Sequence, residues 1–155
     1  MKIISKNVNL DDNKQIRVTI QVPEKWIQED FEGVELMVIE KRSEVFSPNL
    51  NLTVVKDANS NLQNAEIAVH NHVNKLLKFE PITDREVDMN NHKWSIIEYS
   101  FEDEIAGDCL QIVASTIVTR GKNLYVFRFT GICLSTEARR DFGTLRQIVI
   151  SARIE

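Results

Sequence analysis

Alternating apolar and polar side chains mark three strands in the first third of the chain. Residues 16–22 alternate strictly, which predicts a strand with one buried face, and Pro23 ends it. Residues 33–42 carry apolar side chains at both odd and even positions, which predicts a central strand covered on both faces. Residues 49–57 alternate again, and their apolar face consists of Leu50, Leu52 and Val54.

The apolar residues then change to a helical period. Ser60 and Gln63 fit the S-x-x-Q capping box that opens a helix, and Pro81 predicts that this helix ends near Phe79. Its apolar face consists of Leu62, Val69, Val73 and Leu76. A second helix is predicted after Ser135, which is a favourable N-cap residue. The apolar face of that helix consists of Ala138, Phe142, Leu145, Val149 and Ala152.

Between the two helices the pattern predicts further strands. Residues 85–88 are a short candidate strand. Three longer strands follow, at 92–102, 109–119 and 123–132. A three-residue turn that contains a glycine, at 120–122, connects the last two of them. Because the strands come in runs, the fold class is α+β with a mainly antiparallel sheet. We expect about six to seven strands flanked by two main helices, in the order βββ-α-ββββ-α, as a single domain over residues 1–155.

Composition and charge narrow the choice of partner and compartment. The formal net charge is −4 and the isoelectric point about 5.5, which argues against a nucleic-acid partner. No apolar run reaches the length of about 18 residues that a membrane-spanning helix needs. The first residues also lack the apolar run of a secretory signal, so we expect a cytoplasmic protein.

The two cysteines, Cys109 and Cys133, are too few for a disulfide framework. A three-residue loop at 120–122 would place them opposite each other across the hairpin, whereas a loop of even length would move them out of register. Two buried thiols are the expectation for a cytoplasmic chain, but the sequence leaves their bonding open.

No set of residues forms a recognisable catalytic, cofactor-binding or metal-binding site, so we expect none and no enzymatic activity. His70 and His72 lie about 200° apart on the predicted helix, so they cannot share a metal ion. The acidic segment 101–108 fails the pattern of a calcium-binding loop and is interpreted as a hairpin tip. A stripe of arginines beside the apolar face of the last helix is interpreted as solvated charge on apolar stems; it consists of Arg139, Arg146 and Arg153.

Several short stretches together resemble one known family. They are Pro23 and Trp26 in "VPEKW", the segment "FSPNLNLTVV" at 46–55, the amphipathic helix after it, "GKNLYVFRFTG" at 121–131, and the closing "IVISARI" with Ser151. In 46–55, Pro48 fixes its own backbone and biases the preceding residue toward extended geometry, so the stretch is architectural. On these marks the chain resembles the PsbP-like superfamily, and more closely its DcrB and LpqN-like branch.

The resemblance implies an antiparallel sheet flanked by helices and no enzymatic activity. Members of the superfamily act as binding partners. Some assist photosystem assembly, some bind a small GTPase, some are envelope lipoproteins, and some are cytoplasmic chaperones for the hydrophobic N-terminal segments of type VI secretion effectors. The chain shows neither the signal nor the acylated cysteine of the lipoprotein members, which favours the cytoplasmic role.

The sequence therefore predicts a non-catalytic adaptor or chaperone that binds a protein, such as a bacterial secreted or membrane-active effector with a hydrophobic N-terminal segment. The predicted contact residues are Trp26, Phe31, Phe46 and Trp94. Two alternatives stay open: a carrier of a small hydrophobic ligand or lipid, and an immunity-like inhibitor of a basic toxin. An unrecognised enzyme would require an interior polar cluster with shifted pKa values. An exposed edge strand would allow a homo-oligomer.

Overall fold

The computed structural model describes residues 1–42 and 46–155. Two short 3-10 turns, Asp11–Asn13 and Ser135–Glu137, precede β2 and α2. The helices and strands are, in chain order, β1 (Lys2–Asn9), β2 (Gln15–Val22), β3 (Ile27–Glu29), β4 (Leu36–Ile39), β5 (Asn49–Lys56), α1 (Leu62–Val73), β6 (Glu80–Met89), β7 (His92–Asp103), β8 (Gly107–Arg120), β9 (Asn123–Leu134), α2 (Ala138–Ser151) and β10 (Arg153–Ile154).

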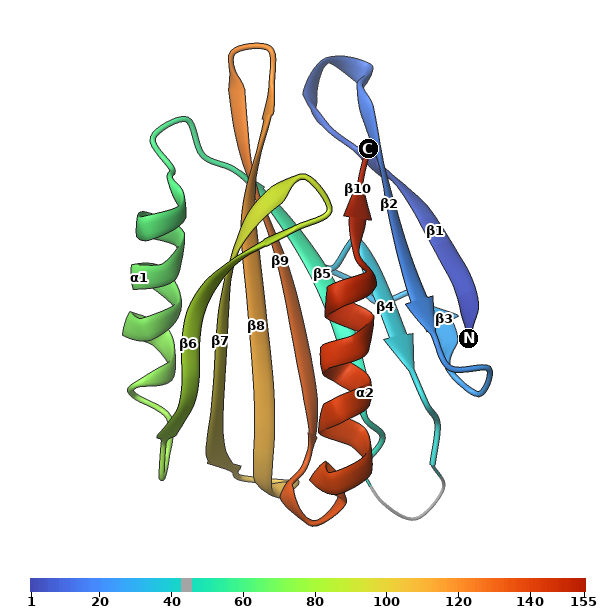
Figure 1. Ribbon diagram of the computed structural model, residues 1–155, viewed down its shortest axis with the longest axis vertical. Helices are drawn as coiled ribbons and strands as arrows, with labels where there is room; N and C mark the ends of the chain where they lie inside the picture. The colour runs from blue at the N-terminus through green and yellow to red at the C-terminus, as the bar shows by residue number, and fades with distance from the viewer. Residues whose placement is uncertain (43–45) are drawn as a thin grey trace.

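The strands form two antiparallel sheets. The larger has seven strands in the order β3-β4-β5-β9-β8-β7-β6, and the smaller has three in the order β1-β2-β10. Helix α2 packs against β9 and β8 of the large sheet and against β2 of the small one, while α1 packs on β8 and β7 (Figure 1). The predicted α+β class, with a mainly antiparallel sheet and two main helices, is confirmed.

The large sheet separates two apolar clusters of different size. Ile96 and Ile97 are neighbours on β7 and belong to different clusters, because successive side chains of a strand point to opposite faces. The larger cluster lies under α2 and the small sheet, and it contains the fully buried Phe127 and Phe129. The smaller cluster lies under α1, which contributes Val69 and Val73 to it. Helix α1 is therefore held by a much thinner core than α2.

The helix boundaries differ from the sequence prediction. The N-cap of α1 is Asn61, whose Oδ1 accepts a hydrogen bond from the Asn64 backbone N–H at 2.7 Å, so the predicted Ser60–Gln63 capping box is wrong. Helix α1 ends at Val73 and not near Phe79. Ser135 begins a 3-10 turn and makes no cap bond to α2. An asparagine beside a serine offers two N-caps of similar strength, and local sequence does not choose between them.

The strands also include elements that the alternation did not reveal. The predicted order lacks β1, β3 and β10, and β6 runs over ten residues where 85–88 was expected. Pro81 lies inside β6. Proline has no backbone N–H to donate, and β6 tolerates this because it is an edge strand, with a partner strand on one side only. The predicted central strand at 33–42 is β4, which has four residues and lies second from the sheet edge.

The cysteines are free and lie on opposite faces of the large sheet. The hairpin loop has two residues, since Arg120 pairs with Asn123, and not the three that the sequence suggested. Cys109 is therefore paired with Leu134, and Cys133 with Leu110. Burial raises the pKa of Cys109 to about 11 and that of Cys133 to about 12, so both thiols are protonated and unreactive near neutral pH.

Candidate binding surface

Helix α1 covers only half of its face of the large sheet. It packs on β7 and β8, and in the described part of the chain no helix lies over the same face of β3, β4, β5 and β9. The strand pairing identifies the side chains on this uncovered half, because directly paired residues point to the same side. We call them the open half-face: Ile27, Glu29, Met37, Ile39, Asn49, Asn51, Thr53, Val55, Thr130 and Ile132.

The open half-face combines exposed apolar side chains with mostly neutral polar ones, and its one carboxylate, that of Glu29 on β3, forms an ion pair with Lys41. Val55 is 58% exposed and Ile27 is 40% exposed, and the residues between them are mostly asparagine, threonine and isoleucine. The partly buried side chains of the open half-face are exposed to solvent only on the side away from the sheet, as expected for one face of a sheet. A surface of this kind suits an apolar segment whose backbone polar groups find amide and hydroxyl partners.

A groove separates the open half-face from α1. It consists of two adjoining hollows of about 170 Å³ each, and Arg128 and Ala68 line both of them. One hollow continues toward Tyr99 and Val113 under α1, and the other toward Val55. The groove therefore leads from the open strands to the base of the helix.

Arg128 places a positive charge in the floor of this groove. Its Nε donates to Ser115 Oγ at 3.0 Å, and its Nη2 donates to the Ala65 carbonyl oxygen at 3.2 Å. Among residues 1–42 and 46–155, no carboxylate forms an ion pair with this guanidinium, and burial lowers its pKa. A half-buried cation with only neutral partners is electrostatically suited to a negatively charged group of a ligand.

The four predicted contact residues are not brought together. Trp26 and Trp94 are 1% and 0% exposed and belong to the larger core cluster, with the Trp94 ring 6.0 Å from that of Phe129. Buried indoles cannot contact a partner without unfolding, so the binding role expected of Trp26 and Trp94 does not fit this structure. The sequence around them gave no sign of this burial, since Trp26 follows Lys25 and Trp94 lies between Lys93 and Ser95.

The other two aromatics have accessible surface. Phe31, in the loop between β3 and β4, is 62% exposed and borders a hollow of about 290 Å³. Phe46 is half-buried just before β5. The hollow at Phe31 is acidic, since one lysine, Lys6, faces four carboxylates from Glu29, Asp30, Glu32 and Glu35.

The predicted arginine stripe is not a stripe in the structure. Arg153 lies in β10 beyond the end of α2. Arg146 binds the fully buried Glu98 of β7 through Nε at 2.5 Å and Nη2 at 3.0 Å, while Thr83 donates to the same carboxylate at 2.6 Å. Burial opposes ionisation of Glu98, but the bonds from Arg146 and Thr83 outweigh it and hold its pKa below the usual value. This network joins α2 to the sheet and is structural.

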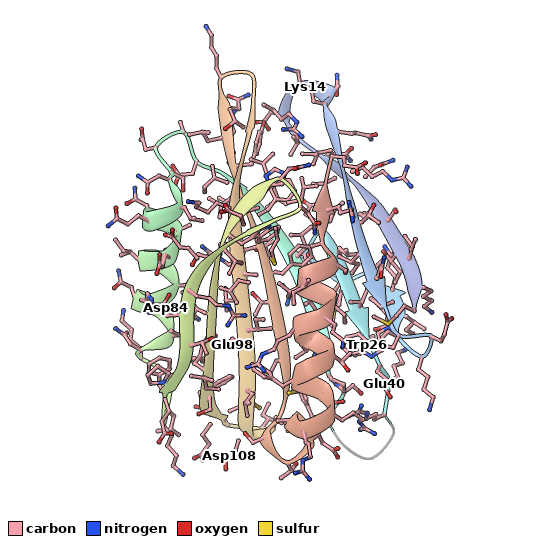
Figure 2. The ribbon with its side chains drawn as sticks, in the orientation of Figure 1. Lys14, Trp26, Glu40, Asp84, Glu98 and Asp108 are labelled. Carbon is pink, nitrogen blue, oxygen red and sulfur yellow. The ribbon has the colours of Figure 1, made fainter. Side chains whose placement is uncertain are left out.

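The two histidines of α1 are separated as expected, but His70 has partners that the sequence analysis missed. His70 Nε2 lies 2.6 Å from Asp84 Oδ2 on β6 and 4.0 Å from Glu66 Oε1, one helical turn earlier. Figure 2 labels Asp84, which lies on β6 beside α1. The spacing of Glu66 and His70 was visible in the sequence as an i,i+4 pair. Asp84 comes from a strand whose position against α1 only the fold determines.

The described part of the chain contains no helix of sufficient length and apolarity to span a membrane.

Comparison with known proteins identifies solved structures that share this fold. No protein-family model matches the chain, and no curated protein matches its sequence. Among solved structures, LpqN, involved in cell envelope biogenesis of Mycobacterium tuberculosis, superposes with a TM-score of 0.79 at 11% identity, over 98% of this chain and 91% of LpqN. Cyanobacterial PsbP from Synechocystis sp. PCC 6803 gives 0.62 at 11% identity, over 97% and 92%.

A third similar structure is that of a protein with a named partner. Mog1p, the Ran-binding protein of Saccharomyces cerevisiae, superposes with a TM-score of 0.53 at 14% identity, over 98% of this chain and 96% of Mog1p. At these identities the likeness concerns the fold alone. The predicted resemblance is confirmed for the fold, which this chain shares with LpqN and with cyanobacterial PsbP.

Proposed function

We propose that this chain, which has the PsbP-like fold, is a non-catalytic binding protein that holds an apolar segment of another protein on its open half-face. The observation that carries the proposal is the uncovered half of the sheet, where Val55 is exposed beside the Arg128 groove and Ile27 is exposed on the edge strand β3. Exposed apolar side chains beside a groove are a common mark of interaction sites.

The finer form of the proposal follows the family resemblance. We infer a cytoplasmic adaptor or chaperone, acting as one domain over residues 1–155, for a bacterial secreted or membrane-active effector. Mog1p, which shares the fold, is named for binding the protein Ran. This supports a protein partner in general, and the identity of the partner rests on the experiment below.

Arg128 and the exposed aromatics refine what the partner should present. A partner segment that places a carboxylate near its apolar residues would compensate the guanidinium, whose partners among the described residues are all neutral. Phe31 lies at the outer edge of the sheet, next to β3, and would extend the contact with the partner beyond the open half-face. The exposed part of the half-buried Phe46 would also contact the partner.

The small-ligand alternative would use the groove instead of the open strands, since the two adjoining hollows of the groove hold about 170 Å³ each. The immunity-like alternative would use the open half-face with a toxin as the bound protein. It therefore differs from the chaperone in the partner and not in the site.

The test compares two substitutions of equally exposed residues on opposite faces. Val55→Lys places a charge on the open half-face, where it also repels Arg128, and Ile150→Lys places the same charge on α2; the two side chains are 58% and 54% exposed. Tagged wild type and both variants are used for pull-downs from the host lysate, read by mass spectrometry, with intact-mass analysis of the bait. A segment of the retained protein is then titrated into each purified variant.

We expect one dominant protein whose affinity falls about tenfold or more with Val55→Lys and stays unchanged with Ile150→Lys. Phe31→Ala should weaken binding to a smaller degree. Equal binding by both lysine variants would reject the open half-face as the site. A bare protein, or a bound small molecule in place of a protein, would reject the proposed function.

A further inference from the structure

Three potential metal ligands meet between α1 and the edge strand β6. Glu66 and His70 come from the helix and Asp84 from the strand, and their ligand atoms all lie within 4.8 Å of one another. All three side chains are partly exposed, so the cluster lies open to solvent on one side. In Figure 2 Asp84 lies on the side of β6 that borders α1.

The spacing of these atoms suits a shared ion. Residues i and i+4 of a helix project to the same side, which is the spacing of helical metal ligands. Ligands bound to one tetrahedral zinc ion lie about 3.4 Å apart, given bonds of about 2.1 Å. The distances from His70 Nε2 are 2.6 Å to Asp84 and 4.0 Å to Glu66, so side-chain shifts of under about 1 Å would bring them into coordination.

The electrostatics of the cluster also suit a cation. The carboxylate oxygens of Glu66 and Asp84 lie within 4.8 Å of each other. Two carboxylates close together repel each other when both are ionised. A divalent ion would offset that repulsion and would bind more tightly than to either carboxylate alone.

We propose that Glu66, His70 and Asp84 form a binding site for a divalent transition-metal ion, with Zn²⁺ as the best fit. Imidazole together with carboxylates suits zinc, whereas Ca²⁺ and Mg²⁺ prefer all-oxygen sites. Water would complete the coordination from the exposed side. The sequence predicted no metal site, because the spacing of His70 and His72 on the helix does not allow the two to share an ion.

An ion here would fasten α1 to β6. The opposite side of α1, with Ala68 and His72, lines the groove. Metal binding would therefore fix the helix that forms one wall of the groove. The site itself depends only on the cluster and is independent of the proposed partner.

The test measures Zn²⁺ binding to tag-free protein by isothermal titration calorimetry, with a thermal unfolding scan on the same samples. His70→Ala removes the imidazole, and Asp84→Asn keeps the size of the side chain while removing its charge. His72→Ala is the matched control, because it deletes a histidine on the same helix two residues away from the site. Circular dichroism confirms that each variant is folded.

We expect Zn²⁺ to bind the wild type and the His72→Ala variant alike and to raise the unfolding temperature of both. His70→Ala and Asp84→Asn should each weaken binding about tenfold or more. Ca²⁺ at the same concentration should bind more weakly and should be indifferent to His70→Ala. No Zn²⁺ binding to the wild type, or an equal loss with His72→Ala, would overturn the proposal, and neither result would bear on the open half-face.

Discussion

At the scale of single residues, Gly131 determines how closely α2 approaches the sheet. A Cβ atom at this position would lie 3.0 Å from Leu145 Cδ2, 3.1 Å from Ile112 Cγ2 and 3.3 Å from Leu50 Cδ1. The first of these atoms belongs to α2, and the other two belong to strands on either side of β9. The core under α2 is therefore closely packed around the missing side chain.

Gly131→Ala should lower the free energy of unfolding by about 1–3 kcal/mol, because the added methyl group overpacks this core. The matched control is Gly143→Ala on α2, where an added Cβ meets nothing within 4 Å. Alanine favours a helix over glycine by up to about 1 kcal/mol, so the control should be neutral or stabilising. Urea unfolding of the two variants measures both values. Equal stability would show that the core relaxes around the methyl group.

At the scale of elements, the two helices differ in how they are attached. Helix α2 has an extensive buried face, and the Ser151 hydroxyl near its end accepts a hydrogen bond from the Gln21 backbone N–H at 2.8 Å. Helix α1 buries only Ala65, Val69 and Val73 and depends more on its N-cap. We therefore expect α1 to open locally before α2 does.

Asn61→Ala should cost about 1 kcal/mol, because it removes the acceptor for the Asn64 N–H. Gln63→Ala should change the free energy of unfolding by less than about 0.5 kcal/mol. A Ser60–Gln63 capping box would instead make this substitution destabilising. Hydrogen exchange of the α1 amides, with those of α2 as the internal reference, measures the local effect. A larger effect of Gln63→Ala would restore the Ser60–Gln63 capping box.

At the scale of the whole molecule, two buried carboxylates join distant parts of the chain. Glu98 binds Arg146 across the sheet–α2 interface, and Asp141 at the start of α2 binds Arg42 after β4 at 2.6 and 2.8 Å. Burial opposes ionisation of Asp141, but the bonds from Arg42 outweigh it and lower its pKa, as they do for Glu98. Both groups are more acidic in the folded chain than in the unfolded one.

The protein should therefore lose stability in acid. A lowered folded-state pKa contributes stability above the unfolded-state pKa of about 4, and this contribution disappears as the pH falls through the folded-state pKa. Urea unfolding between about pH 7 and pH 3 should show this decline. Glu98→Gln should make stability depend less steeply on pH, because the variant lacks this titrating carboxylate. Arg146→Met at neutral pH should be strongly destabilising, because it leaves the charge of Glu98 buried without its main cationic partner. A curve for Glu98→Gln as steep as that of the wild type would contradict this assignment.

Most of the secondary structure could be predicted from local patterns. The strict alternation at 16–22 and 49–57 and the apolar faces of both helices survive in β2, β5, α1 and α2, because side-chain periodicity follows directly from backbone geometry. The errors lie where local signals compete or are weak. They include the N-cap of α1, the length of its last turn, and β1, whose exposed positions hold Ile3, Ser5, Asn7 and Asn9.

Local patterns in the sequence were enough to predict the fold class and the two amphipathic helices. The contacts between side chains follow from the tertiary structure, which leaves half of one sheet face open, places Arg128 beside neutral partners, buries Trp26 and Trp94, and brings Asp84 to His70. The physical reason is that local periodicity says which side of an element is apolar. Strand order and helix placement, which arise from contacts between residues far apart in the chain, decide what lies against that side.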